Sequence, residues 1–137
     1  MKIADTYDGV MLALTVWREA RGESLEAKRG VAHVILNRMD DPRWPDTVAA
    51  VVTQSRQFSC FNAGDPNAIK FPTQKQAADW AAWVECCEVA GDALLGGYDP
   101  TKRANHYESV EDSSKRPAWA DAEKMTLITG MIRFYRL

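Results

Sequence analysis

Apolar residues recur at helical spacing through the first third of the chain. Residues 8–21 predict a first helix, and Gly22 is expected to end it in the left-handed conformation that often closes a helix. Ser24 is expected to cap a second helix that runs to Met39. The apolar positions behind these predictions are Val10, Leu14 and Trp17 in the first helix and Val31, Val34, Ile35 and Met39 in the second.

Two further helices are predicted beyond the prolines at positions 42 and 45. Asp46 is expected to cap a short third helix over residues 46–52. Thr73 and Gln76 have the spacing of a capping box and are expected to open the longest helix, residues 73–95. The face of that helix expected to be buried consists of Ala77, Trp80, Ala81, Val84, Cys87 and Leu94.

The last third of the chain has shorter apolar segments, which favour strands. One strand is predicted over residues 104–107. Residues 126–129 and 132–135 flank Gly130 and predict a terminal hairpin. The predicted fold class is therefore α+β, a mainly helical body with a small antiparallel sheet. The length of 137 residues fits one domain over the whole chain, residues 1–137.

Composition and charge narrow the function classes. The 17 basic and 19 acidic residues are mixed along the chain and leave a net charge of -2, which argues against a nucleic-acid partner. No signal peptide or membrane span is recognised, so we expect no stable membrane association. Five tryptophans are many for this length. Such rings often stack on sugar faces, although a place in the core is the commoner explanation for any one ring.

Histidine and cysteine residues give little support to metal or thiol chemistry. The two histidines, His33 and His106, have no partner at the spacing of a zinc motif, so no metal and no cofactor are predicted. His33 is expected to be structural. Cys86 and Cys87 are adjacent and are interpreted as free thiols of a protein folded in a reducing compartment. Cys60 with His106 stays open as a nucleophile pair on residue type alone.

Two carboxylates flank the junction of the first two predicted helices. Glu19 falls in the last turn of the first helix, where the negative end of the dipole favours a protonated carboxyl group. Glu23 falls at the start of the second helix, where the positive end favours a carboxylate. Opposed environments of this kind let two acids divide catalytic roles. Taken alone, such a pair is more often solvated or capping.

Several motifs in order resemble one family. Residues 12–23 read LALTVWREARGE, residues 30–38 read GVAHVILNR, and residues 41–45 read DPRWP. The segments Gln57-Phe58-Ser59, ANHY at 104–107 and PAWA at 117–120 follow. Together they resemble the cell-wall hydrolases related to bacterial spore cortex-lytic enzymes, which also occur as phage endolysins. One position departs from the family pattern, because Ile132 stands where histidine is common.

The resemblance implies a lysozyme-like fold and cleavage of the MurNAc–GlcNAc β-1,4 bond of peptidoglycan. Glu19 is then the expected general acid, with Glu23 as a second catalytic carboxylate. A lytic transglycosylase, in which the sugar's own 6-hydroxyl attacks, is favoured over a muramidase that uses water. Polar groups expected along the substrate groove, with hydrogen bonding inside the fold as their alternative role, are Gln57, Ser59, Asn105 and Tyr107.

Other functions stay open from the sequence. An N-acetylmuramoyl-L-alanine amidase is one, although few metal ligands are available for it. A non-catalytic peptidoglycan-binding or virion structural module is another. Free thiols and the lack of a recognised export signal favour a monomeric phage endolysin. Such a protein accumulates in the host cytoplasm until a holin releases it to the peptidoglycan of the periplasm.

Overall fold

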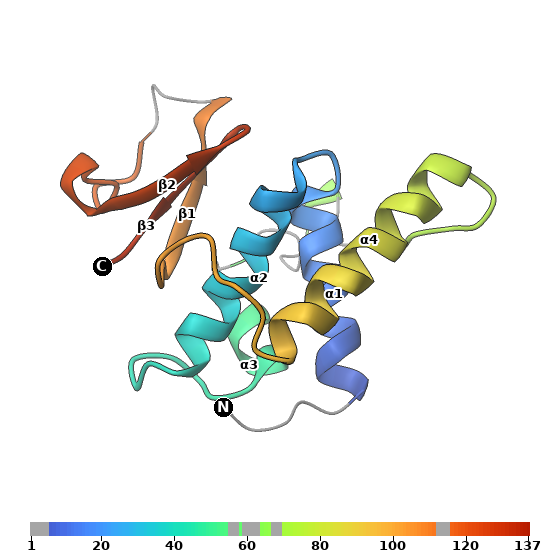
Figure 1. Ribbon diagram of the computed structural model, residues 1–137, viewed down its shortest axis with the longest axis horizontal. Coiled ribbons are helices and arrows are strands. Elements are labelled where there is room, and N and C mark those ends of the chain that lie inside the picture. The colour runs from blue at the N-terminus through green and yellow to red at the C-terminus, as the bar shows by residue number, and fades with distance from the viewer. Residues whose placement is uncertain (1–5, 55–57, 59–63, 67–69, 112–115) are drawn as a thin grey trace.

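A computed structural model describes residues 6–54, 58, 64–66, 70–111 and 116–137 of the chain. It confirms the α+β class, with a helical body beside a small sheet (Figure 1). The elements, in chain order, are α1 (Thr6–Ala20), α2 (Leu25–Met39), α3 (Val48–Val52), α4 (Ala77–Leu94), β1 (His106–Ser109), the 3-10 helix η4 (Ala122–Lys124), β2 (Met125–Thr129) and β3 (Ile132–Tyr135). Within those described residues, no helix is long and apolar enough to cross a membrane.

The turn between α1 and α2 is short and fixed by local hydrogen bonds. The Ser24 hydroxyl accepts a hydrogen bond from the backbone N–H of Ala27 at 3.1 Å, which confirms Ser24 as the cap of α2. Gly22 does not adopt the left-handed conformation, so that prediction is wrong. The turn closes instead through the Glu23 N–H, which donates to the carbonyl of Ala20 at 2.9 Å.

The caps of α3 and α4 differ from the sequence predictions. Thr47, not Asp46, caps α3 by accepting from Ala50 N at 3.2 Å. The predicted capping box at Thr73 is also wrong, because α4 begins four residues later at Ala77 and Gln76 makes no side-chain cap. The backbone N–H of Thr73 donates to the Asp79 carboxylate at 3.1 Å. An acid in the first turn of α4 thus provides a hydrogen-bond acceptor for the segment before the helix.

The buried face of α4 is rotated from the predicted one. The buried positions are Cys86, Val89, Ala90 and Ala93, whereas Ala77, Ala81, Val84 and Cys87 are exposed. The first turns of α4 project beyond the helical body (Figure 1), and the fully buried positions of α4 all lie in its second half, although Ala82 and Trp83 also pack against the core. In α1 the same kind of error affects Val10, which is 49% exposed. In the predicted stripe of α2, Val31, Val34 and Ile35 are fully buried and Met39 is partly buried.

The sheet has the order β1-β3-β2 and is antiparallel throughout. The predicted hairpin is confirmed, and Gly130 turns it with a φ of 54°. The predicted first strand is displaced, because β1 covers His106–Ser109 rather than 104–107. Gly30 of α2 lets the sheet approach closely, since a Cβ there would overlap the ring of Phe134. This contact brings the sheet and the α1–α2 turn around one cavity.

Candidate active site

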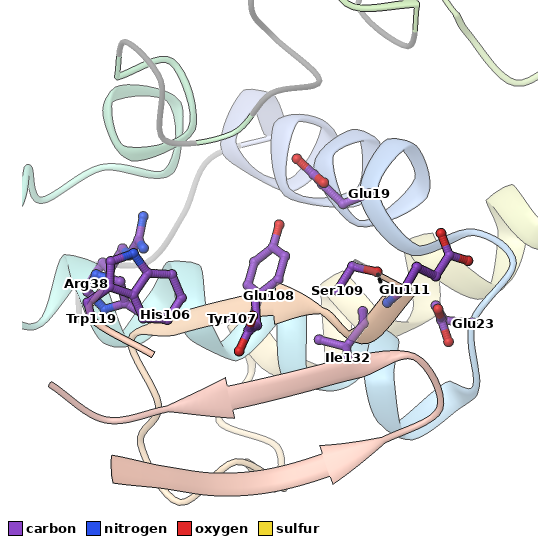
Figure 2. A pocket seen from close by; sticks show the side chains of 10 residues that line it. All are labelled: Glu19, Glu23, Arg38, His106, Tyr107, Glu108, Ser109, Glu111, Trp119 and Ile132. Carbon is purple, nitrogen blue, oxygen red and sulfur yellow. Dashed lines mark hydrogen bonds between the residues drawn. The ribbon is translucent and has the colours of Figure 1, made fainter. Parts of the chain in front are cut away.

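A cavity of about 660 Å³ lies between the end of α1 and the sheet (Figure 2). The segments that line it are far apart in sequence: the end of α1 and the α1–α2 turn, the end of α2, β1 and the residues after it, the region before β2, and the start of β3. Its lining residues are Glu19, Glu23, Arg38, His106, Tyr107, Glu108, Ser109, Glu111, Trp119 and Ile132. Both predicted catalytic carboxylates are therefore on the wall of one cavity.

Glu19 occupies the predicted place in the last turn of α1. Its neighbours Arg18 and Ala20 are buried, and Glu19 itself is half-buried at the edge of the core. Figure 2 shows the ring of Tyr107 rising from β1 toward the helix that carries Glu19. A carboxyl group at a helix C-terminus, partly withdrawn from water and facing an open cavity, has the situation that a general acid requires.

Glu23 connects the α1–α2 turn to the hairpin. Its Oε2 accepts a hydrogen bond from the backbone N–H of Met131 at 3.3 Å. Beside it, the Ser24 and Thr129 hydroxyls are 3.3 Å apart. A Cβ at Gly130 would lie 2.6 Å from Oε2 of Glu23, so the carboxylate rests against the turn of the hairpin. The structure thus gives Glu23 a fixed position on the cavity wall.

The four residues predicted to line the substrate groove have different outcomes in the structure. Tyr107 lines the cavity and packs between Phe58 and Phe134, with ring centroids 6.3 and 6.0 Å away. Asn105 does not line it, because its buried amide bonds to the backbone of Leu137 and to the ring of His106. The structural role that was its alternative is the one observed. Gln57 and Ser59 lie outside the described residues.

An aromatic and cationic group forms the end of the cavity away from Glu23 (Figure 2). The His106 ring lies 4.8 Å from the ring of Trp119 and 5.8 Å from that of Trp44. Arg38 is buried, donates from Nε to the carbonyl of Asn105 at 2.7 Å, and has its guanidinium 5.3 Å from the Trp44 ring. Burial lowers the pKa of Arg38.

His106 is held neutral by these surroundings. Its pKa is lowered to about 4, first by burial and then by the positive charges of Arg38 and Arg43. At neutral pH the imidazole is therefore uncharged and offers one donor and one acceptor nitrogen.

The buried carboxylate of Glu108, on β1, is the centre of a network of ion pairs and hydrogen bonds. The Glu108 carboxylate accepts a short hydrogen bond from the Tyr135 hydroxyl and lies 3.4 Å from Nε of Arg133 and 3.6 Å from Nε of Arg116. Arg116 also donates to the Tyr135 hydroxyl at 2.8 Å. These contacts join β1 to β3, the strand whose first residue, Ile132, forms an apolar part of the cavity wall.

Comparison with known proteins matches residues 22–135 to the family described as Cell Wall Hydrolase. The chain belongs to this cell wall hydrolase family. Glu19 lies just before the matched residues and Glu23 lies within them. The family resemblance of the sequence motifs is thereby confirmed.

Curated relatives of this cell wall hydrolase are spore cortex-lytic enzymes. The protein of Oceanobacillus iheyensis is 31% identical over 112 residues, which are 80% of this chain and 35% of that protein. The protein of Bacillus subtilis is 30% identical over 112 residues, 80% of this chain and 32% of that protein. The chain thus spans about a third of the length of these relatives.

Solved structures resemble the hydrolase over nearly its full length. The catalytic domain of the germination-specific lytic transglycosylase SleB from Bacillus anthracis has a TM-score of 0.75 and 26% identity, and covers 97% of each chain. The catalytic domain of the Bacillus cereus SleB protein has a TM-score of 0.76 and 25% identity, covering 99% of this chain and 95% of that one. These matches confirm the lysozyme-like fold predicted from the family motifs.

In the part of the chain that the structure describes, the free thiols do not line the cavity, and no metal-binding group is found. Over those residues, no group of three or more His, Cys, Asp or Glu side chains could hold a metal ion. Cys86 and Cys87 of α4 are free thiols, and burial raises the pKa of both. His33 is buried on α2, as its structural interpretation requires, and burial lowers its pKa. Cys60, which the sequence leaves open as a nucleophile with His106, is outside the described residues.

Sequence reasoning missed several residues of the cavity wall. Arg38 and Trp119 were not predicted as site residues, and His106 only as a possible partner of Cys60, although all three fall within the motifs that carried the family resemblance. This signal went unused because no spacing rule links Arg38 of α2 to residues 68 and 81 positions later. Glu108 and Glu111 had no signal, since only the pairing of β1 with β3 brings that strand to the cavity.

Proposed function

We propose that this domain cleaves the glycan strands of peptidoglycan at the MurNAc–GlcNAc β-1,4 bond, with Glu19 as the general acid. The observation that carries the proposal is the convergence of Glu19, Glu23 and Tyr107 on one cavity in a member of the cell wall hydrolase family. The likeness to a catalytic domain named as a lytic transglycosylase supports the same chemistry.

In the proposed reaction, the Glu19 carboxyl group gives its proton to the glycosidic oxygen as the bond from that oxygen to C1 of MurNAc breaks. Positive charge develops on the sugar ring. The 6-hydroxyl of the same MurNAc then attacks C1, and its proton returns to the Glu19 carboxylate. The products are a strand ending in a 1,6-anhydro sugar and a strand with a free GlcNAc hydroxyl. Glu19 finishes in its starting protonation state.

We propose attack by the 6-hydroxyl over hydrolysis because of the position of Glu23. The intramolecular reaction requires one acid that later acts as a base, and no second carboxylate has to attack C1. One oxygen of Glu23 is already bonded to the Met131 N–H, which suits a group that orients substrate or stabilises developing positive charge. Tyr107, on the wall toward Glu19, is proposed to contact the sugar near the scissile bond.

Fragment analysis tests the proposal. Purified sacculi are digested with the wild-type protein, and the released pieces are identified by mass spectrometry, with the Glu19→Gln variant as the control. Anhydro-MurNAc ends are expected. Reducing MurNAc ends would assign a muramidase, and free stem peptides an amidase. Binding to sacculi without release of fragments would assign a non-catalytic wall-binding module.

We further propose that the protein serves a phage as its endolysin, reaching the periplasm of the host through a holin and acting there as a monomer. The free thiols of Cys86 and Cys87 support folding in a reducing compartment. Expression in a Gram-negative host should cause lysis when a holin is co-expressed and not otherwise. Lysis without a holin would contradict this role and leave the proposed chemistry intact.

A further inference from the structure

The orientation of the Asn105 side chain is fixed by the backbone of Leu137. The N–H of Leu137 donates to Oδ1 of Asn105 at 2.9 Å, and Nδ2 of Asn105 donates to the main-chain oxygen of Leu137 at 3.0 Å. A backbone N–H can only donate, and the main-chain oxygen can only accept. The two contacts therefore identify which atom of the amide is oxygen and which is nitrogen.

This orientation fixes the tautomer of His106. Oδ1 of Asn105 lies 2.9 Å from Nδ1 of the His106 ring. Because Oδ1 can only accept, Nδ1 has to carry the proton. A neutral imidazole has one N–H, so Nε2 carries a lone pair and acts as an acceptor. Arg38 and Arg43 oppose a second proton on the ring, and their charge with burial gives the low pKa of His106 described above.

The acceptor nitrogen belongs to a ring on the cavity wall. Over the residues that the structure describes, no hydrogen bond engages Nε2 of His106. Trp119, also on the wall, places its ring 4.8 Å from the imidazole. The pair thus combines an aromatic surface with a neutral acceptor. A carboxylate or phosphate has no proton to give that acceptor, whereas a pyranose has hydroxyl and acetamido N–H donors beside an apolar face.

We propose that His106 and Trp119 form a sugar-binding subsite of the cavity, in which Nε2 of His106 accepts a hydrogen bond from a hydroxyl or acetamido N–H of one pyranose unit. The inference rests on the proposed function. Trp119 packs against the same unit, and Asn105 is a positioning residue that holds the proton on Nδ1. The subsite is at the opposite end of the cavity from Glu23 (Figure 2), so it binds strand rather than taking part in bond cleavage.

Nitrogen NMR tests the tautomer without any substrate. The chain has two histidines, so the spectrum of His106→Asn contains His33 alone and assigns both rings. At neutral pH, Nδ1 of His106 should resonate as a protonated nitrogen and Nε2 as an unprotonated one. Asn105→Ala should let the proton redistribute to Nε2. A protonated Nε2 in the wild-type protein would overturn the inference.

Binding of purified glycan fragments to protein carrying Glu19→Gln tests the subsite. Adding His106→Asn keeps an amide beside Asn105 but removes the acceptor at the Nε2 position, and should weaken binding roughly 2- to 10-fold, the range for one neutral hydrogen bond. Adding His106→Gln, whose longer side chain reaches that position, should restore part of the loss. Trp119→Ala should also weaken binding, whereas Tyr98→Ala, an exposed ring away from the cavity, should not.

In the otherwise wild-type enzyme, His106→Asn should raise KM and leave kcat nearly unchanged. Equal binding by the His106→Asn and parent proteins, both shown to be folded by circular dichroism, would overturn the subsite while cleavage by the wild-type enzyme keeps the proposed function. A wild-type protein that neither binds nor cleaves glycan strands would overturn both.

Discussion

Oε2 of Glu23 accepts a hydrogen bond from the backbone N–H of Met131 at 3.3 Å, across 108 residues of sequence. The contact ties the turn after α1 to the hairpin of β2 and β3, which are the two parts of the fold that enclose the cavity. A carboxylate that forms such a contact can affect both the stability of the hairpin and the chemistry beside it. The two effects can be separated by substitution.

Glu23→Gln retains an oxygen that can accept from Met131, so the fold should hold while the negative charge is lost. Turnover of sacculi should fall, but less completely than for Glu19→Gln. Glu23→Ala also removes the acceptor and should lower the free energy of unfolding by about 1 kcal/mol. Urea denaturation and fragment release measure the two effects. If Glu23→Gln turned over at the wild-type rate, Glu23 would have a structural role alone.

Gly130→Ala should disturb the same contact from the opposite side. The residue has a φ of 54°, where an L side chain costs about 1–2 kcal/mol, and the new Cβ would meet Oε2 of Glu23. Both stability and turnover should decrease. Gly91→Ala is the matched control, because it lies inside α4 with open space for a Cβ and should stabilise by about 0.5–1 kcal/mol. A stability of Gly130→Ala equal to wild type would contradict the described turn.

Local sequence signals predicted the parts of the fold that depend on neighbouring residues. Ser24 as a cap, the buried stripe of α2 at Val31, Val34 and Ile35, and the hairpin around Gly130 all follow from spacing and turn chemistry. The errors occur where tertiary packing decides. The fully buried positions of α4 all lie in its second half, so the apolar residues of its first turns gave a misleading face.

The part of the candidate site that lies within one short sequence motif could be predicted from the sequence. Glu19 lies in the last turn of α1 and Glu23 in the four-residue turn that follows, so local chain geometry keeps the two carboxylates together. Asn105 was placed in the groove because its type is polar, yet a backbone contact to Leu137 some 32 residues away occupies its amide. Such non-local hydrogen bonds leave no pattern along a single chain.

Acid should destabilise the protein through its histidines. His33 and His106 both have pKa values lowered by burial, that of His106 to about 4 from 6.5. Below pH 6.5 the unfolded chain therefore takes up protons before the folded one does. The free energy of unfolding should fall as the pH decreases from 6.5 toward 4, and His106→Asn should reduce that slope. Urea titrations over this range measure it, and an identical slope in the variant would contradict the buried, neutral His106.

Thiol alkylation of the native enzyme should leave its activity unchanged. Burial raises the pKa of Cys86 to about 12, so its thiol should stay unmodified until unfolding, while the exposed Cys87 reacts slowly. Neither residue lines the cavity. Peptide mass spectrometry locates the label, and activity is measured on the same sample. Loss of activity without unfolding would favour a nucleophilic pair of Cys60 and His106 instead.

The rate at which Glu19→Gln releases glycan fragments from purified sacculi tests the central claim most directly. Gln keeps the size of Glu19 but has no acidic proton to give the glycosidic oxygen. The control is Glu26→Gln, an exposed carboxylate of α2 away from the cavity, which should retain the wild-type rate. We predict that Glu19→Gln folds like the wild-type protein and releases fragments about 10²–10⁴-fold more slowly. A folded Glu19→Gln that clears sacculi at nearly the wild-type rate would show that Glu19 is not the acid.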